Sequence, residues 1–258
     1  MIRIGNFFIM TEYLIESCLY LKQTKILPKK TRGCFVLLFI VYIHTHFWHL
    51  KTYHSLEQWF SWMEDLSSRD YVVIDHFFQD TLYAEIKSFF LGKLSDFTKA
   101  GIGTNSDTQI NKNIRGDFTY WLDRKRDVQL QSFWKLLDEI IYMFNRYCYL
   151  SLSGFEFHLA HYPTGGHYDK HLDQFENRSN RMISVIIYFN DGWQKGDGGE
   201  LEIFEKDESS FLVEPIAARC VMFKSAEVPH AVLQAHKSRF SVTGWLLYQP
   251  SALGRFLG

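Results

Sequence analysis

The sequence predicts a mainly β protein with flanking helices (an α+β fold), in which the strands form a jelly-roll or cupin-like barrel. From Phe155 to Tyr248 the chain reads as about eight short strands separated by Gly, Asn-Asp and Pro, which is typical of such barrels. Upstream of Phe155, apolar side chains recur at helical spacing. The composition, 47% hydrophobic with 17% aromatic residues, supplies a thick core for both parts.

The N-terminal half is expected to contain three helices and one strand. Ser55-Leu56-Glu57-Gln58 is a capping box, which predicts that a short helix begins there. Residues 71–74 are an apolar run expected to form a buried strand. A second helix is expected from Asp80 and a third over residues 127–147, with a loop rich in Gly, Asn, Ser and Thr over residues 100–112 between them.

The C-terminal half is expected to contain the barrel strands. They cover residues 155–162, 167–173, 181–190, 199–204, 211–216, 219–224, 230–234 and 239–248. The helices of the N-terminal half should then pack on the outside of one barrel sheet, because their apolar faces need a partner.

The chain is expected to divide into an N-terminal extension, residues 1–53, and one folded domain, residues 54–258. The extension carries a basic cluster at residues 29–32 and an apolar run that approaches membrane-spanning length only if it is extended over residues 34–50. Three interpretations stay open: a membrane anchor, an amphipathic or disordered leader, and the product of an upstream start site without selected structure. The expected location is the cytoplasm, with membrane anchoring through residues 34–50 as the alternative.

Charge and cysteine content exclude several classes of protein. The formal net charge is −1, so nothing in the sequence favours nucleic acid as a partner. The four cysteines are scattered, without the close pairs of a zinc site or the pattern of a disulfide framework. A reducing, intracellular setting is therefore expected.

The stretch His171-Leu172-Asp173 carries the first chemical signal. In an extended strand successive side chains alternate between faces, so His171 and Asp173 are expected to share one face. One imidazole and one carboxylate are two of the three ligands of a non-haem Fe(II) oxygenase, and His230 is the candidate for the third. The same ligand set also suits catalytic zinc. Arg239 favours iron, because a buried guanidinium suits a dicarboxylate co-substrate.

Further motifs follow in a fixed order along most of the chain, from about Tyr71 to Tyr248. They are Ile114-Arg115-Gly116-Asp117, Tyr162-Pro163, Tyr168-x-x-His171-x-Asp173, Arg181, Tyr188-Phe189-Asn190, Gly198-Gly199-Glu200-Leu201, Glu214-Pro215, Pro229-His230-Ala231-Val232, and Arg239 with Thr243 and Trp245. On these motifs the sequence resembles the prolyl 4-hydroxylase family of 2-oxoglutarate- and Fe(II)-dependent dioxygenases, including the hypoxia-inducible-factor prolyl hydroxylases and their microbial relatives.

The resemblance implies a double-stranded β-helix that binds Fe(II) through His171, Asp173 and His230, with 2-oxoglutarate and O₂ as co-substrates and ascorbate as a candidate reductant. It implies that Arg239 pairs the distal carboxylate of 2-oxoglutarate, with the Tyr188 hydroxyl bonded to the same carboxylate. The other residues expected around the co-substrate are Thr243, Tyr162, Leu201, Val232 and Trp245. A metal-binding carboxylate at Asp173 also favours hydroxylation over halogenation.

The resemblance further implies a protein or peptide substrate that carries a target proline. Arg115, Asp117, Tyr168 and Arg181 are the expected substrate-binding residues, with Asp117 paired to Arg181.

Two rival functions are kept. The first is hydroxylation of a free amino acid or another small molecule, since the chain departs from the animal enzymes near the expected entrance, at His167 and Gln174. The second is a non-catalytic cupin-like binding module, which the presence of all three ligands disfavours. The sequence leaves open the target protein, the oligomeric state and any regulation by oxygen.

Overall fold

A computed structural model describes residues 52–100, 115–174 and 180–248. The chain divides into two compact units, Met1–Thr52 and Tyr53–Gly258, and every element below belongs to the second. The apolar segment 34–50 lies outside the described residues, as does nearly all of the loop over 100–112. In the part of the chain that the structure describes, no helix combines the length and apolarity needed to cross a membrane.

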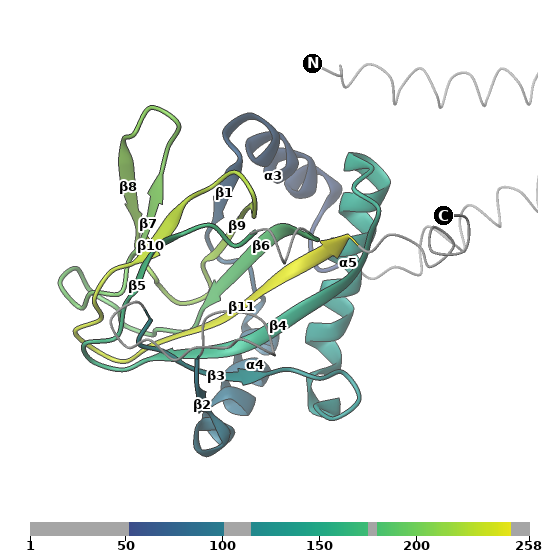
Figure 1. The fold of residues 1–258 in the computed structure, drawn as a ribbon. Coiled ribbons are helices and arrows are strands. Elements are labelled where there is room, and N and C mark those ends of the chain that lie inside the picture. The colour runs from purple at the N-terminus through teal and green to yellow at the C-terminus, as the bar shows by residue number, and fades with distance from the viewer. Residues whose placement is uncertain (1–51, 101–114, 175–179, 249–258) are drawn as a thin grey trace, which may run out of the picture. The chain divides into compact units, whose positions relative to one another are not determined.

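Two antiparallel sheets dominate the domain (Figure 1). Their strands are β1 (Tyr71–Ile74), β2 (Thr98–Lys99), β3 (Phe118–Trp121), β4 (Leu152–Tyr162), β5 (Tyr168–His171), β6 (Arg181–Tyr188), β7 (Leu201–Phe204), β8 (Ser210–Val213), β9 (Cys220–Lys224), β10 (His230–Val232) and β11 (Arg239–Tyr248). The larger sheet has the order β1-β9-β6-β11-β4-β3-β2 and the smaller has the order β5-β10-β7-β8. All eight strands expected downstream of residue 154 are present, so the mainly β prediction is confirmed.

The helices cover the outer face of the larger sheet (Figure 1). They are α3 (Leu56–Arg69), α4 (Asp80–Gly92) and α5 (Gln131–Cys148). The capping box is confirmed, because the Ser55 hydroxyl accepts from the Gln58 amide while the Gln58 side chain accepts from the Ser55 amide. Their apolar faces and the outward residues of the sheet form one buried core that is rich in Phe and Trp.

The sequence prediction differs from the structure at two points in the N-terminal half. The third helix begins later than expected, since residues Val128–Leu130 form a short 3₁₀ turn before α5 starts at Gln131. Strands β2 and β3 were not expected. Strand β3 follows directly after Arg115-Gly116-Asp117 and pairs with β4, so it widens the larger sheet.

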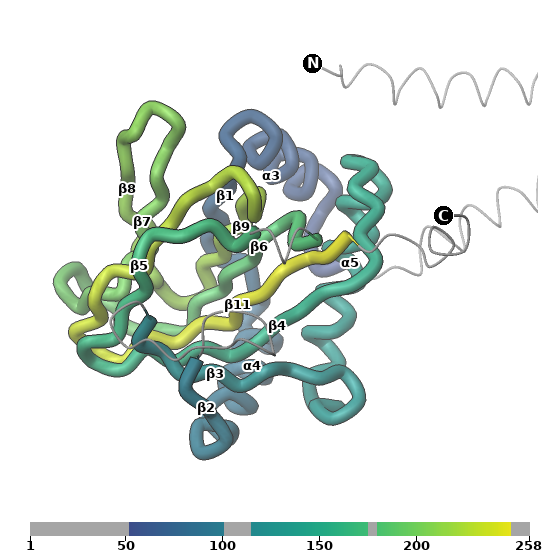
Figure 2. Tube along the Cα trace, viewed as in Figure 1, coloured from purple at the N-terminus to yellow at the C-terminus, as the bar shows by residue number. Residues whose placement is uncertain are grey.

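A second, smaller core lies between the two sheets. It contains inward residues of both sheets, among them Tyr162, Ile186 and Tyr188 from the larger and Leu201 and Val232 from the smaller. Strand β10 pairs with both β5 and β7, and the tube view shows β5 and β7 to one side of β6 and β11 (Figure 2). The expected site residues occur on both sides of this space.

Candidate active site

Three side chains converge between the sheets: His171 at the end of β5, Asp173 in the bend that follows, and His230 at the start of β10. Their candidate ligand atoms all lie within 4.8 Å of one another. Nε2 of His171 is 3.6 Å from Oδ1 of Asp173, and Nε2 of His230 is 3.6 Å from Oδ2. Strands β5 and β10 place the two histidines directly opposite each other in register. The expected convergence is therefore present.

The expected strand over residues 167–173 is too long at both ends. Strand β5 ends at His171, and Asp173 lies in a bend beyond it. Asp173 reaches the histidines because the chain bends after β5. The alternation of side chains along a strand, on which the prediction relied, is not the cause. Gln174 then donates its backbone N–H to the Ser225 carbonyl, which ties the bend to the larger sheet.

Backbone carbonyls orient both imidazoles. Nδ1 of His171 lies 2.7 Å from the carbonyl oxygen of Asp169, and Nδ1 of His230 lies 3.1 Å from that of Val228. A carbonyl oxygen only accepts, so each Nδ1 carries the proton and donates it. Each Nε2 then presents a lone pair toward Asp173, which is the tautomer that binds a metal ion.

Asp173 is held in place by a hydroxyl from the opposite sheet. Oγ of Ser184, on β6, donates to Oδ2 of Asp173 at 2.7 Å and lies 2.9 Å from Oγ of Ser225. Burial acts to raise the pKa of Asp173, and the neighbouring side chains of His230 and His171 together with the hydrogen bond from Ser184 outweigh it, so its pKa is below the usual value. Burial lowers the pKa of His230 to about 4, which keeps its Nε2 unprotonated at neutral pH.

Arg239, the first residue of β11, is a buried cation without a carboxylate partner among the described residues. It is 2% exposed, its Nε donates to the Gly199 carbonyl at 2.9 Å, and its Nη1 donates to Oγ of Ser241 at 3.2 Å. Its guanidinium carbon lies 4.8 Å from the ring centre of Tyr162 and 5.0 Å from that of Tyr188. A buried guanidinium is costly without an anion, so this arrangement suits an anionic ligand.

Tyr188 stands beside this cation, and Thr243 is linked to it only through Ser241. The Tyr188 hydroxyl is fully buried and has no hydrogen-bond partner in the described structure. Burial raises its pKa, so it stays a neutral donor. Oγ1 of Thr243 lies 3.1 Å from Oγ of Ser241, so a chain of hydrogen bonds runs from the Arg239 guanidinium through Ser241 to Thr243.

A cavity of about 290 Å³ joins the three converging side chains to Arg239. Its lining includes the predicted residues Arg115, Tyr162, Tyr168, Arg181, Leu201, Val232, Thr243 and Trp245. Stacking fixes part of the wall, because the ring centres of Tyr168 and His171 are 3.7 Å apart and the two rings are nearly parallel. The cavity combines a largely apolar lining with one metal-binding cluster and one cation that can bind an anion.

Arg115, the first residue of Arg115-Gly116-Asp117, lines this cavity, but the expected ion pair between Asp117 and Arg181 is wrong. The fully buried Asp117 carboxylate accepts from Nε and Nη2 of Arg115, at 2.6 and 2.9 Å. Arg181 instead contacts Glu156 at 3.3 Å. Burial acts to lower the pKa of Arg115, and the bond to Asp117 raises it, with a net rise. The Arg115 guanidinium carbon lies 4.7 Å from the Tyr168 ring centre, so the ion pair positions that ring.

Comparisons with known proteins match this geometry. The family model of the 2OG-Fe(II) oxygenase superfamily matches residues 157–247. A prolyl-4-hydroxylase from Pseudomonas putida has 32% sequence identity and a TM-score of 0.67, and the match covers 74% of this chain and 100% of that chain. The chain belongs to the prolyl 4-hydroxylase family of 2OG-Fe(II) oxygenases.

Two more distant structures share the fold of this oxygenase. A Trichoplax adhaerens prolyl hydroxylase, solved in complex with a peptide fragment of the hypoxia-inducible factor, has 23% identity and a TM-score of 0.67, with 74% of this chain and 90% of that chain covered. A prolyl 4-hydroxylase from Phytophthora capsici has 21% identity and a TM-score of 0.60, with 77% and 70% covered.

The cofactors of this family are Fe(II), 2-oxoglutarate and O₂, and the residues present fit them. Two imidazole nitrogens and one carboxylate form the set that Fe(II) oxygenases use. The buried Tyr188 hydroxyl without a partner and the buried Arg239 without a carboxylate are complementary to the distal carboxylate of 2-oxoglutarate. The prediction of Fe(II) with 2-oxoglutarate is therefore confirmed.

Several residues of the oxygenase site were not expected from the sequence. Trp121 and His158 line the cavity, and Ser184 holds the carboxylate ligand. Trp121 belongs to the unexpected strand β3, and His158 lies in a strand whose periodicity alone suggests core. The only signal in the sequence was that His158 is a polar residue at an inward position of an apolar strand.

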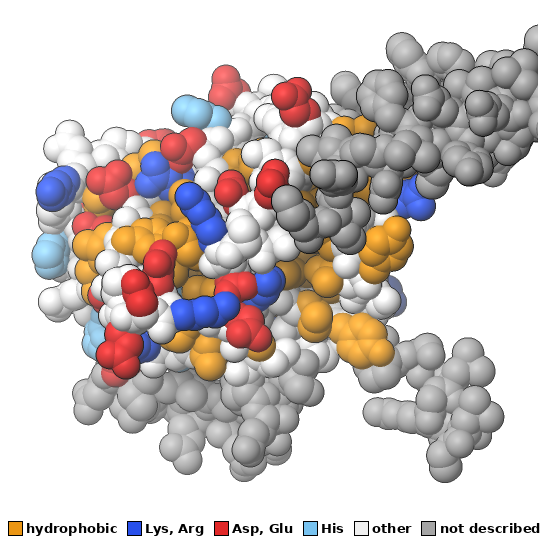
Figure 3. All heavy atoms as spheres, turned by 90° about the horizontal axis from the view of Figure 1, so that it is seen from above, with side chains coloured by type: hydrophobic (Ala, Val, Ile, Leu, Met, Phe, Trp, Pro, Cys, Tyr) orange, Lys and Arg blue, Asp and Glu red, His pale blue; other side chains and the backbone are white. Residues whose placement is uncertain are grey.

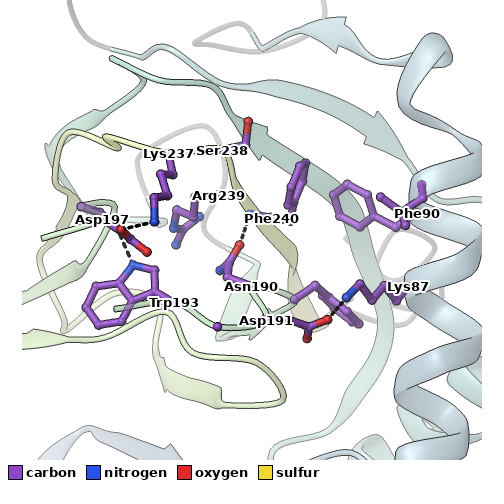
Figure 4. A pocket seen from close by; sticks show the side chains of 14 residues that line it. Lys87, Phe90, Asn190, Asp191, Trp193, Asp197, Lys237, Ser238, Arg239 and Phe240 are labelled. Carbon is purple, nitrogen blue, oxygen red and sulfur yellow. Dashed lines mark hydrogen bonds and ion pairs between the residues drawn. The ribbon is translucent and has the colours of Figure 1, made fainter. Parts of the chain in front are cut away.

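A second hollow of about 280 Å³ reaches Arg239 from another side, between α4 and the segment that follows β6 (Figure 4). Its other cations are already paired, Lys87 with Asp191 and Lys237 with Asp197. On the face shown in Figure 3, acidic and basic side chains are interspersed, without a large area of one sign. The unmatched charge is Arg239, which the two cavities share.

Proposed function

We propose that this oxygenase hydroxylates a prolyl residue in a protein or peptide, with conversion of 2-oxoglutarate to succinate and CO₂. The 32% identity to a prolyl-4-hydroxylase over the whole of that chain supports this assignment. The complex of the Trichoplax enzyme with a peptide adds support for a peptide substrate, although that relative shares only 23% identity.

The observation that carries the proposal is an exposed apolar mouth beside the metal ligands. Trp121 is 48% exposed and Leu172 is 39% exposed, and both line the cavity that contains His171 and His230. Large apolar side chains left in water at a cavity mouth favour a partner that covers them. A peptide continues on both sides of the reacting residue and so has further groups to cover such side chains, which a free amino acid lacks.

We assign the roles of the site residues as follows. His171, Asp173 and His230 bind the iron, which with 2-oxoglutarate and O₂ supplies the oxidising power for insertion of one oxygen atom into a C–H bond. Arg239 binds the distal carboxylate of 2-oxoglutarate through its planar fork, and Tyr188 donates its hydroxyl proton to the same carboxylate.

The remaining wall keeps water out of the reacting centre. Leu201, Val232 and Ile186 are buried residues that line the cavity from both sheets. Such a lining strengthens the charge interactions of Arg239 and shields reactive species from solvent. Arg115, locked by Asp117, holds Tyr168 against His171, so the peptide-facing wall and a metal ligand are fixed together.

The test is mass spectrometry of the host proteome with and without the gene, searching for a proline that gains one oxygen atom only when the gene is present. A synthetic peptide around that proline is then incubated with the purified protein, Fe(II), 2-oxoglutarate and ascorbate. We expect hydroxyproline and succinate in equal amounts. The matched control is His230→Ala, which removes one metal ligand and should abolish both products.

Two results would contradict the proposal. The first is an unchanged set of oxidised prolines together with succinate formation driven by a free amino acid. The second is coupled oxidation of a residue other than proline in the identified protein.

A further inference from the structure

Two buried hydroxyls lie one behind the other next to the carboxylate ligand. Oγ of Ser184 donates to Oδ2 of Asp173 at 2.7 Å, and Oγ of Ser225 lies 2.9 Å from Oγ of Ser184. Both serines are fully buried. Ser184 is on β6, and Ser225 follows directly after β9, which ends at Lys224. Two neighbouring strands of the larger sheet are thus connected to one metal ligand.

The direction of these hydrogen bonds follows from the ligand. An ionised carboxylate can only accept hydrogen bonds, and a serine hydroxyl has one proton to donate. Since Ser184 uses that proton for Asp173, its oxygen accepts the bond from Ser225. The chain of donors therefore runs from Ser225 through Ser184 to Asp173. In a buried site each bond of such a chain polarises the next, so the Ser225 hydroxyl strengthens the bond to Asp173.

The main chain of Ser225 is held independently of its hydroxyl. Its N–H donates to the Met182 carbonyl at 3.1 Å, and its carbonyl accepts from the N–H of Gln174, the residue after Asp173, at 3.1 Å. Loss of the hydroxyl alone should therefore leave the bend at Asp173 in place. The contribution of the hydroxyl can be measured separately from that of the backbone.

The turn that contains Ser225 also orients a second ligand. The N–H of Val228 donates to the Lys224 carbonyl at 3.2 Å, which closes the turn between β9 and β10. The carbonyl of Val228 in turn accepts from Nδ1 of His230 at 3.1 Å. One turn thus bears on both Asp173 and His230, so it influences how these two ligands face each other.

The two carboxylate oxygens of Asp173 have different surroundings. Oδ2 accepts the bond from Ser184, whereas Oδ1 lies 3.6 Å from Nε2 of His171, which carries a lone pair. An oxygen that accepts a strong hydrogen bond has less electron density for a metal ion, so Oδ1 is the better ligand. A carboxylate that binds through one oxygen occupies one coordination position, and one that binds through both occupies two.

We propose that Ser225 is a positioning residue of the metal site. It acts through Ser184 to keep Oδ2 of Asp173 engaged, so that the carboxylate binds the metal through Oδ1 alone. Positions that 2-oxoglutarate and O₂ need then stay open. The inference concerns the metal site only, and it holds whichever substrate residue the enzyme hydroxylates.

The test measures metal affinity in a double-mutant cycle. Co(II) is titrated into the full-length protein in competition with a chelating dye. We expect about 3- to 10-fold weaker binding in Ser225→Ala, because the bond from Ser184 to Asp173 is no longer polarised. In the Ser184→Ala background the same substitution should cause no further loss, since Ser225 acts through Ser184. Unchanged affinity in Ser225→Ala would overturn the inference, and so would losses that simply add.

Infrared spectroscopy supplies a signature that a general loss of stability would not produce. The protein is labelled with ¹³C at the aspartate carboxyl groups, and spectra are compared with and without Co(II). The two carboxylate stretching bands lie further apart when one oxygen binds the metal than when both bind. We expect a wide separation in the unaltered protein and a narrower one in Ser225→Ala. A narrow separation in the unaltered protein would contradict the assignment of Oδ1.

The matched control is Ser210→Ala. Oγ of Ser210 donates to Glu202 at 2.7 Å, and neither residue lines the active-site cavity, so this variant should bind Co(II) as the unaltered protein does. Thermal unfolding of the metal-free variants checks their fold. If Ser225→Ala fails to fold, Ser225→Cys replaces it, because a thiol fills similar space but is a weak donor. The same loss of affinity and the same non-additivity with Ser184→Ala are then expected.

Discussion

Replacing Arg239 by lysine should weaken 2-oxoglutarate binding far more than metal binding. The guanidinium has five N–H donors, and the bonds from Nε to Gly199 and from Nη1 to Ser241 use two of them. Three donors remain in a fixed plane for an incoming carboxylate. Lysine keeps the charge but concentrates its donors at one point, so it cannot satisfy Gly199 and Ser241 and also bind a carboxylate in bidentate fashion.

The magnitude follows from burial. Arg239 is 2% exposed and has no carboxylate partner among the described residues, so the bond to 2-oxoglutarate forms in a site with little water. Losing one partner of a buried, hydrogen-bonded charge pair costs about 2–5 kcal/mol, which is roughly 30- to several-thousand-fold in affinity. Arg239→Lys should fall at the lower end of that range, because the charge is retained.

Calorimetric titration of 2-oxoglutarate into the Zn(II)-loaded protein measures this effect, and a separate titration measures metal affinity. The matched control is Arg124→Lys, since Arg124 pairs with Asp138 at 2.7 Å and its side chain is 44% exposed. That variant should bind 2-oxoglutarate normally. An affinity for 2-oxoglutarate within twofold of the unaltered protein in Arg239→Lys would refute the assigned role. Equal affinity of the unaltered protein for pyruvate and 2-oxoglutarate would refute it as well.

Three other predictions follow from the same cavity. Gly199→Ala should weaken 2-oxoglutarate binding about tenfold, because Gly199 has φ +77° and an added Cβ would lie 2.9 Å from Cδ of Arg239; unchanged binding in a titration would contradict this. Ser184→Ala should weaken metal binding about 10- to 100-fold, since Asp173 loses the bond that orients it, and competition with a chelating dye measures the change. His158, whose pKa is lowered to about 3, takes up a proton near pH 6.5 only in the unfolded chain, so its contribution to stability falls as pH drops below about 6.5. Urea unfolding at pH 7 and pH 5 should therefore show a loss about 2 kcal/mol smaller in His158→Phe, and equal losses would refute the argument.

The sequence by itself determined the barrel and most of its chemistry. Short segments separated by turn residues predict β strands. When apolar side chains recur at every second residue, they lie on one face of a strand but not on one face of a helix. His171, Asp173, His230 and Arg239 were identifiable because few arrangements of those residue types suit anything other than a metal and an anion. These inferences depend on the local pattern of residue types and on side-chain chemistry, and both can be read from the sequence.

The tertiary structure decided which side chains meet. Asp117 binds Arg115, two residues away, and Arg181 contacts Glu156, which contradicts the pairing expected from the resemblance. The sequence offered several cations of equal chemical merit for Asp117. Only the path of the chain at Gly116, where an added Cβ would lie 3.1 Å from Cα of Gly166, sets which one is close.

One wall of the cavity was likewise decided by sheet register. Trp121, His158 and Trp245 are far apart in the sequence, and their rings form one cluster only because β3 pairs with β4 and β4 with β11. A shift of one residue in either pairing would turn His158 to the opposite face, since side chains alternate along a strand. Register depends on packing across the whole sheet, and for that reason the local sequence could identify the metal ligands and Trp245 but not Trp121 and His158.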